Sequence, residues 1–178
     1  MIALAHLLVV LILIRLFRLD QAEAFAAMLF GVLIDIDHVF GMVDFISLRG
    51  WGDSFNLSAA LTADVQWKSL FHSPIAAAIV LPASVGFRMA VPLLAWGLHL
   101  LMDWVQIEYL GVLSMVEMIL MLVLFAVLLV LEKRDLDSNG QKHTYLMVVQ
   151  NWARQVVEGI SNLTNGFRRS LGLLDTSR

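Results

Sequence analysis

The chain has 178 residues, of which 60% are hydrophobic and 15% charged, and its formal net charge is −3 at pH 7. Soluble domains average about 45–50% apolar and 25% charged residues, so this composition predicts a membrane protein. The slight negative charge excludes the broad basic field of a nucleic-acid-binding protein. The sequence has no cysteine, so any metal would need nitrogen and oxygen ligands.

Apolar runs predict an all-α, polytopic membrane bundle of about five spans, at 2–19, 22–46, 72–87, 89–110 and 112–131. We expect this bundle to fill residues 1–131, followed by a polar linker at 132–143 and an amphipathic tail at 144–178. In the first run the arginines follow the apolar stretch, which favours an uncleaved helix over a secretory signal peptide. The alternative stays open because Ala22-Glu23-Ala24 resembles a small-residue cleavage site.

Basic residues fall unevenly on the two sides of such a bundle. With five spans, one side would receive ten lysines and arginines, and the other only Arg49 and Lys68. Cytoplasmic loops carry the excess of positive charge. We therefore expect a multi-pass protein of the cell membrane, with its N-terminus outside and its C-terminus in the cytoplasm.

The tail repeats apolar residues at helical spacing over 144–174. These residues are Trp152, Val156, Ile160, Leu163, Phe167 and Leu171. The pattern predicts a helix lying on the membrane surface. A helix that binds a membrane-protein partner, or a second subunit, is the alternative.

The second span contains the most unusual stretch, because Asp35, Asp37 and His38 interrupt an apolar run. A carboxylate at the bilayer centre costs about 2.5–3.5 kcal/mol on insertion scales. Asp-x-Asp-His within a span is therefore hard to explain by packing alone, and it suggests a functional site.

Other polar residues are expected at the same depth. At about 1.5 Å per residue, His6, His72, His99 and Asp103 all fall in the outer half of the bundle together with Asp35 and His38. His6 alone also fits a hydrogen-bonded helix contact, and His99 with Asp103 fits a pair within one helix. Glu117, near the outer end of the fifth span, fits helix packing better.

Imidazoles and carboxylates gathered at one depth predict a site for one or two divalent ions, with zinc as the first choice. We expect Asp37 to be a ligand, a support for a ligand or a general base. The predicted metal ligands are His6, Asp35, Asp37, His38, His72, His99 and Asp103.

The order of these residues resembles the membrane-bound metal-dependent hydrolases of the YdjM-like family. The family pattern is approximately Leu-Pro-Asp-x-Asp-His, His-Arg-x-x-Thr-His-Ser and His-x-x-x-Asp. The matching segments here are Leu33-Ile-Asp-Ile-Asp-His38, Trp67-Lys-Ser-Leu-Phe-His-Ser73 and His99-Leu-Leu-Met-Asp103. The resemblance implies metal-dependent hydrolysis. This chain departs from the pattern at Ile34, Trp67, Lys68 and Phe71.

The leading functional hypothesis is a membrane-embedded hydrolase that cleaves an ester or phosphodiester bond of a lipid or other amphiphile at the outer leaflet. In this hypothesis the loop at 47–71 covers the site. The first alternative is a catalytically inert, metal-stabilised accessory subunit of a larger membrane complex, which Trp67 and Phe71 favour. The second is an ion or proton pathway, although the inner halves of the spans offer few polar groups.

Overall fold

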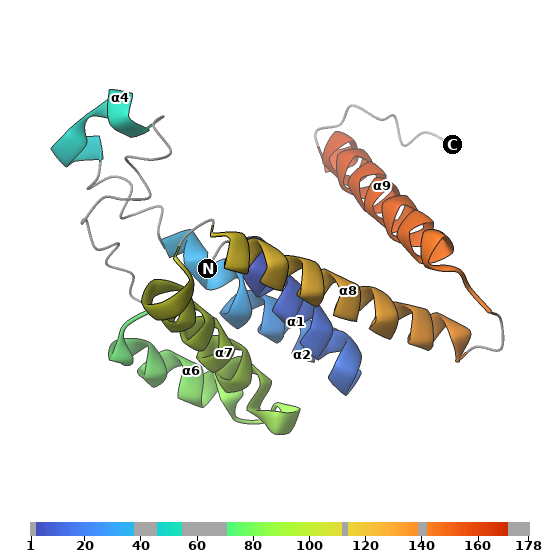
Figure 1. Ribbon diagram of the computed structural model, residues 1–178, viewed down its shortest axis with the longest axis horizontal. Helices are drawn as coiled ribbons and strands as arrows, with labels where there is room; N and C mark the ends of the chain where they lie inside the picture. Colours follow the sequence, from blue (N-terminus) through green and yellow to red (C-terminus); the bar gives the residue numbers. More distant parts are fainter. Residues whose placement is uncertain (1–2, 38–45, 55–70, 112–113, 139–141, 171–178) are drawn as a thin grey trace. The chain divides into compact units, whose positions relative to one another are not determined.

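The computed structural model of the chain describes residues 3–37, 46–54, 71–111, 114–138 and 142–170. Throughout these residues all regular secondary structure is helical, as the composition predicts (Figure 1). The chain divides into two compact units, Met1–Leu128 and Leu129–Arg178. The elements are α1 (Ala3–Phe17), α2 (Gln21–Gly31), η1 (Leu33–Asp37), α4 (Trp51–Ser54), η2 (Pro74–Ala76), α6 (Ala77–Ser84), η3 (Arg88–Ala90), α7 (Val91–Val105), η4 (Gln106–Leu110), α8 (Met115–Asp137) and α9 (Tyr145–Ser170).

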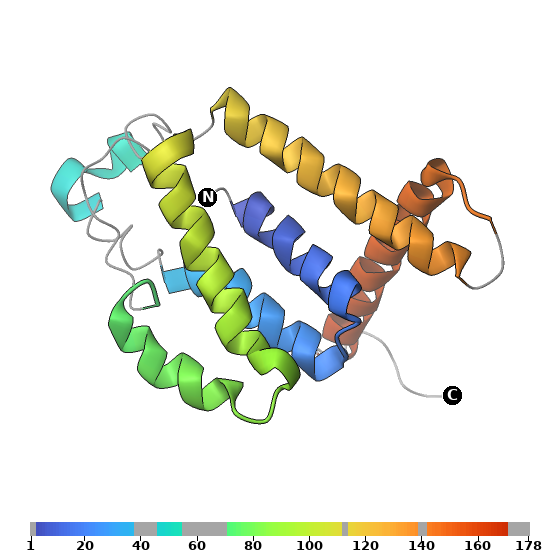
Figure 2. The same cartoon turned by 60° about the horizontal axis from the view of Figure 1, so that its bottom comes forward.

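Helix α7 is the centre of the first unit and contacts α1, α2 and α6. Figure 2 shows α7 running between α6 and the pair formed by α1 and α2. Small residues such as Ala27 and Ala95 allow these helices to approach closely, and larger apolar side chains fill the remaining space. The buried core consists of Val10, Ala27, Phe30, Ile34, Val80, Val91 and Ala95.

A network of polar contacts closes one end of this bundle. Asp20 caps α2 by accepting a hydrogen bond from the Glu23 amide at 2.9 Å, and the Glu23 carboxylate accepts one from the Asp20 amide at 3.0 Å. The Arg88 guanidinium donates to the carbonyls of Phe17 at 2.9 Å and Arg18 at 3.3 Å, and to Glu23 at 3.2 Å. The turn before α7 is thereby attached to the turn between α1 and α2.

Gly31 marks the end of α2 and a close contact between helices. A Cβ atom at this position would lie 2.5 Å from Val10 Cγ2 and 3.4 Å from Ala95 Cβ, so only glycine fits without displacing a neighbour. The next residue, Val32, has a φ of −135° and leaves the helical conformation. The chain then turns into η1, so α2 does not continue as one helix through the expected span at 22–46; residues 38–45 lie outside the described part.

Two stretches are long and apolar enough to cross a membrane, Arg88–Leu110 and Met115–Asp137, and each has 23 residues. The structure therefore supports two candidate spans among the residues it describes, and it does not support the expected count of five. The other apolar helices, Ala3–Phe17 and Pro74–Ser84, are shorter. At about 1.5 Å per residue, the 15 residues of α1 reach about 22 Å, which is less than the roughly 30 Å hydrocarbon core.

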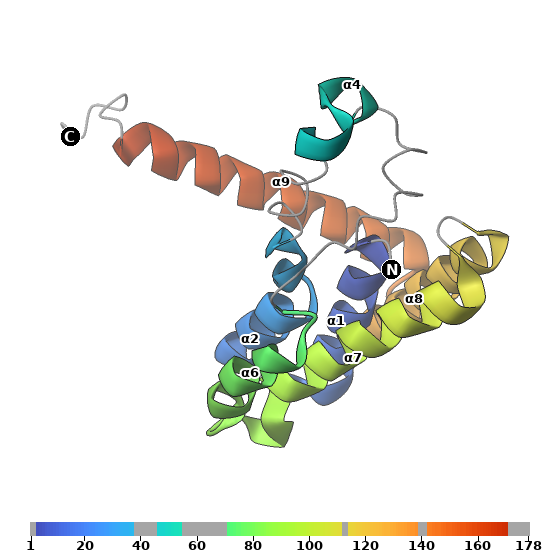
Figure 3. The same ribbon diagram turned by 90° about the vertical axis from the view of Figure 1, so that its left-hand side faces the viewer.

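Helix α8 extends six residues into the stretch expected to be a linker, because it ends at Asp137 rather than near 131. Glu132, Lys133 and Arg134 end the apolar run, but they are good helix formers and do not end the helix. Lys133 also pairs with Asp137 one turn later. Helix α9 covers most of the amphipathic stretch that the sequence predicts, and Figure 3 shows it as one continuous helix.

Candidate metal centre

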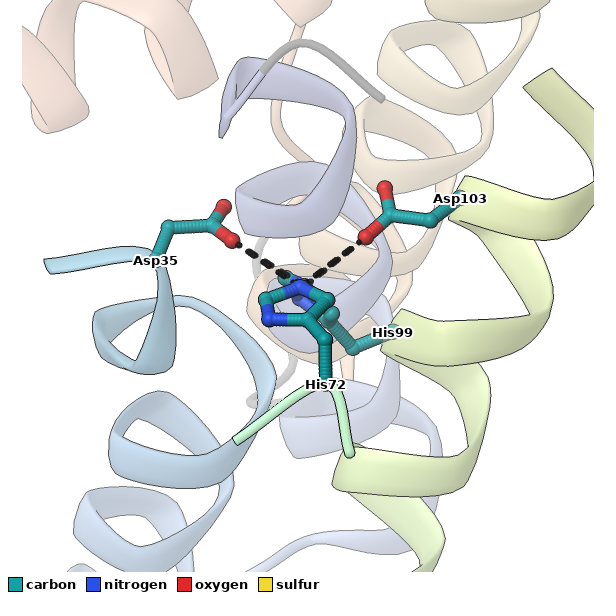
Figure 4. A group of neighbouring side chains, drawn as sticks. All are labelled: Asp35, His72, His99 and Asp103. Atoms are coloured by element: carbon teal, nitrogen blue, oxygen red, sulfur yellow. Dashed lines mark hydrogen bonds and ion pairs between the residues drawn. The ribbon is translucent and has the colours of Figure 1, made fainter. Parts of the chain in front are cut away.

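Four side chains from three segments of the bundle converge on one point (Figure 4). Asp35 comes from η1, His72 from the segment before η2, and His99 and Asp103 from successive turns of α7. One donor atom from each side chain lies within 4.8 Å of the other three. The structure thus brings together four of the seven residues predicted as metal ligands.

The donor atoms are close enough together to hold a metal ion. The Nε2 atoms of His72 and His99 are 2.9 Å apart, and they lie 3.2 Å from Asp103 Oδ2 in each case. Asp35 Oδ1 lies 3.1 Å from His99 Nε2 and 3.5 Å from His72 Nε2. Metal–ligand bonds of 2.0–2.1 Å in a tetrahedron place neighbouring donors about 3.3 Å apart. The five distances lie within about 0.4 Å of that value, and all four donors lie within 4.8 Å of one another, so this group could hold a metal ion.

The hydrogen bond of His99 shows that a proton or a metal ion must lie between its ring and the two carboxylates. Its Nδ1 atom lies 3.0 Å from the Gly31 carbonyl oxygen, and because a carbonyl only accepts hydrogen bonds, Nδ1 carries a proton. The Nε2 lone pair of the neutral ring then points toward the carboxylate oxygens of Asp35 and Asp103. A second proton or a metal ion must therefore lie between these acceptors. A backbone carbonyl behind the distal nitrogen is a common support for metal-binding histidines.

Trp96 fixes the segment that carries His72. Its indole Nε1 donates to the Phe71 carbonyl at 2.8 Å, and Trp96 lies on α7 one turn before His99. Positions 96, 99 and 103 lie on one face of α7. This face therefore supplies two of the donors, His99 and Asp103, and Trp96 holds the backbone beside the third donor, His72. The sequence predicts that His99 and Asp103 share one helix, but it does not predict the bond from Trp96 to the Phe71 carbonyl, because that bond joins distant segments.

His6 lies behind the four donors. Its side chain is 1% exposed, its Nε2 atom is 3.0 Å from Asp103 Oδ1, and its ring stacks on His99 with centroids 3.9 Å apart. Asp103 therefore has His6 at one carboxylate oxygen and the two other histidines at the second. His6 is well placed to orient Asp103, while its predicted role as a ligand stays a prediction.

The remaining predicted residues contribute less to this picture. Asp37 is the last residue of η1, and its side chain lies outside the described part of the structure, as does His38. Residues 55–70, including Trp67, Lys68 and most of the expected covering loop, also lie outside it. Glu117 is fully buried and accepts a hydrogen bond from Gln106 at 3.0 Å. This contact agrees with the expected packing role of Glu117.

The chain matches no known protein family, no curated protein and no solved structure.

Proposed function

We propose that this chain is a multi-pass membrane protein whose His–Asp cluster binds a divalent metal ion and hydrolyses an amphiphilic substrate. The observation that carries the proposal is the convergence of two imidazole nitrogens and two carboxylate oxygens, with His99 held by the Gly31 carbonyl. The imidazole nitrogens and carboxylate oxygens are all possible metal ligands, and they meet at one point where His99 is buried and the other three side chains are about one-fifth exposed.

In the proposed membrane arrangement, α7 and α8 cross the bilayer and the shorter helices pack beside α7. Arg88 at the start of α7 and Lys133 and Arg134 at the end of α8 then share one side, which the positive-inside rule makes cytoplasmic. Helix α1 runs from His6 beside Asp103 to Phe17 beside Arg88. This direction puts the N-terminus on the outer side, and the C-terminus follows α8 into the cytoplasm.

This placement brings the metal centre to the outer part of the bundle. His99 and Asp103 are about 16–23 Å along the 23-residue stretch that begins at Arg88 and has a length of about 33 Å, so the centre lies between its middle and its outer end. Trp104 and Tyr109, which form an edge-to-face pair near the outer end, are 52% and 68% exposed. Exposed Trp and Tyr side chains concentrate at headgroup level in membrane proteins. A substrate at this site is therefore an amphiphile whose ester or phosphodiester bond lies near the outer headgroups.

The donor set is suited to chemistry as well as to binding. Asp35, His72 and Asp103 would hold the ion together with His99, and the side chains of the first three remain about one-fifth exposed. Zinc is the first candidate because the donors are nitrogen and oxygen atoms at tetrahedral spacing. A divalent ion bound there supplies Lewis-acid polarisation of a substrate oxygen and activation of water. Asp37, two residues after Asp35, is the candidate general base.

A structural metal site in an inert accessory subunit is the second candidate, and one observation favours it. Four protein donors are enough to complete a tetrahedral shell, as in structural zinc sites, whereas catalytic sites keep one position for water or substrate. Partial exposure of three donors and the absence of thiolate ligands favour the catalytic role.

Metal analysis of the purified protein tests the proposal. We expect close to stoichiometric zinc or another divalent ion in the wild type, and its loss in His99→Ala and Asp35→Asn. Glu23→Gln is the matched control, because it changes a buried carboxylate that contacts Asp20 and Arg88 at the opposite end of the bundle, and it should leave the metal content unchanged. A wild type without bound metal would overturn the whole proposal.

Turnover separates the two candidates. Metal-loaded protein in vesicles is incubated with chromogenic lipid esters and phosphodiesters, with and without a chelator. Metal is then added back to the chelated sample, and hydrolysis is measured again. Hydrolysis that is lost and restored with the metal supports the enzyme. Stoichiometric metal with no turnover, together with a lower melting temperature after chelation, supports the structural site instead.

A further inference from the structure

Helix α9 has an unusually clear division between apolar and polar faces. Among the described residues of α9, the apolar side chains of Leu146, Val149 and Val157 are 67%, 42% and 66% exposed, whereas Val148 is buried. Val149 and Glu158 are nine residues apart, which at 100° per residue puts them on opposite sides of the helix. An exposed apolar stripe of this length marks an interaction surface.

We propose that α9 lies along the bilayer surface and binds anionic phospholipid, with its apolar face inserted at the boundary between headgroups and acyl chains. The proposal rests on the proposed membrane crossing of α8, and it is independent of the metal chemistry. A helix with one apolar face, one polar face and low net hydrophobicity is the typical form of such interfacial segments.

The connection between α8 and α9 supports this position. The carboxylate of Asp137 at the end of α8 accepts a hydrogen bond from the His143 amide at 2.7 Å. Lys133, one turn earlier, lies over the Tyr145 ring, with Nζ 5.8 Å from its centroid. The first turn of α9 is therefore held against the charged last turns of α8. Because those charged turns would lie where α8 leaves the bilayer, α9 begins at headgroup level.

The charges of α9 indicate which lipids it prefers. Between Tyr145 and Ser170 the sequence has three arginines, at positions 154, 168 and 169, and one glutamate, Glu158. This excess of two positive charges complements anionic headgroups, each basic residue near such a surface contributing about 1 kcal/mol. The remaining polar positions are mostly uncharged, such as Asn151, Gln155 and Asn162. A bilayer can cover the whole apolar face, which extends about 39 Å over 26 residues.

Site-directed spin labelling of the full-length protein in vesicles tests this proposal, and the cysteine-free sequence makes single labels simple. One label replaces Val149 on the apolar face (Val149→Cys), and its matched control replaces Glu158 on the opposite face (Glu158→Cys). A third, Val123→Cys, reports on the middle of α8, where Val123 is 52% exposed. Accessibility to oxygen and to a water-soluble nickel chelate is measured in phosphatidylcholine vesicles with and without phosphatidylglycerol.

With phosphatidylglycerol present, we expect the label at 149 to be exposed to oxygen and protected from nickel, and the label at 158 to show the reverse. Equal nickel access at both positions would overturn the proposal. So would protection at 149 that is independent of lipid charge, and spin–spin broadening in that case would identify a second copy of the chain as the occupant. A water-exposed label at 123 would show that α8 does not cross the bilayer, and this result would also overturn the proposal.

Replacing charge provides a second measurement. Arg154→Gln should lower the ratio of surface-bound to free α9 about fivefold in anionic vesicles and leave it unchanged in pure phosphatidylcholine. No change in anionic vesicles would contradict the lipid preference. Metal content measured on the same samples distinguishes the two proposals, because loss of α9 binding should not alter it.

Discussion

The two ends of the α1–α2–α7 bundle handle buried carboxylates in different ways. At one end, Glu23 is 7% exposed and faces the Arg88 guanidinium, a permanent cation, at 3.2 Å. At the other end, Asp35 and Asp103 face the imidazoles of His72 and His99, with His6 behind Asp103. The Glu23–Arg88 pair is neutral when both groups have their ordinary charges. The second end becomes neutral only when it takes up protons or a metal ion.

The two ends of the bundle therefore differ in role: the arginine end stabilises the fold, and the His–Asp end is arranged to bind a cation. Arg88 also donates to two backbone carbonyls at the end of α1, so its contacts hold the turns of the bundle together, and a guanidinium has no lone pair to offer a metal. The His–Asp end instead directs lone pairs toward a shared centre, which stabilises the fold only when a cation is bound. The comparison predicts that changes at one end should alter stability and changes at the other should alter metal binding.

The largest expected effect comes from the same carboxylate-to-amide change at each end. Asp103→Asn removes a donor and its charge, and we expect metal affinity to fall at least about 100-fold. Glu23→Gln should leave metal affinity within about twofold, since Glu23 touches only the arginine end. Competition with a fluorescent zinc chelator measures both variants. Equal losses would show that the two ends are not independent.

His6 tests how Asp103 is oriented. We expect His6→Ala to weaken metal binding about 10- to 100-fold without changing the number of ions bound, as for other groups that support a ligand. His6→Gln, whose amide nitrogen can also donate to Asp103 Oδ1, should recover part of this loss. Isothermal titration gives affinity and stoichiometry together. A reduced number of ions would mean that His6 is itself a ligand.

Gly31 joins helix packing to the metal centre. Gly31→Ala places a Cβ atom 2.5 Å from Val10 Cγ2, and such overpacking costs about 1–3 kcal/mol. Because the Gly31 carbonyl holds His99, we also expect metal affinity to drop about tenfold. Gly97→Ala is the matched control on α7, since a Cβ there has no atom within 4 Å. Gly31→Ala should lower both the unfolding temperature and the metal affinity in the chelator assay, whereas Gly97→Ala should lower neither, since alanine favours the helix more than glycine does.

The smallest effect is expected at the arginine end. Arg88→Met removes the donor to Glu23 and to two carbonyls, and we expect the free energy of unfolding to fall by about 1–2 kcal/mol. Metal affinity should stay unchanged. Combining Arg88→Met with Glu23→Gln should recover some stability, because the buried charge is then gone. Urea unfolding in detergent gives the free energies, and a metal-binding defect in Arg88→Met would contradict the separation of the two ends.

The sequence predicted the helical class, and four of the seven residues that it indicated as metal ligands lie together in the structure. Four polar residues lie in or beside apolar runs: Asp35, His72, His99 and Asp103. Burying such residues is costly unless they contact one another or a bound ion, so their positions predict that they meet. The number of membrane spans was harder to predict. Hydropathy counts apolar residues but does not show where a helix stops, and α2 stops at Gly31 within an apolar run.

Local composition by itself determined the helical fold, the amphipathic character of α9 and the set of candidate donors, because helical spacing and hydropathy depend only on neighbours along the chain. Tertiary structure decided which nitrogen of His99 faces the centre, how Trp96 attaches the His72 segment, and that His6 lies behind Asp103. These features join residues far apart in sequence, and no local pattern specifies them; the close approach of α2 to α1 and α7 at Gly31 is one example of the packing that does.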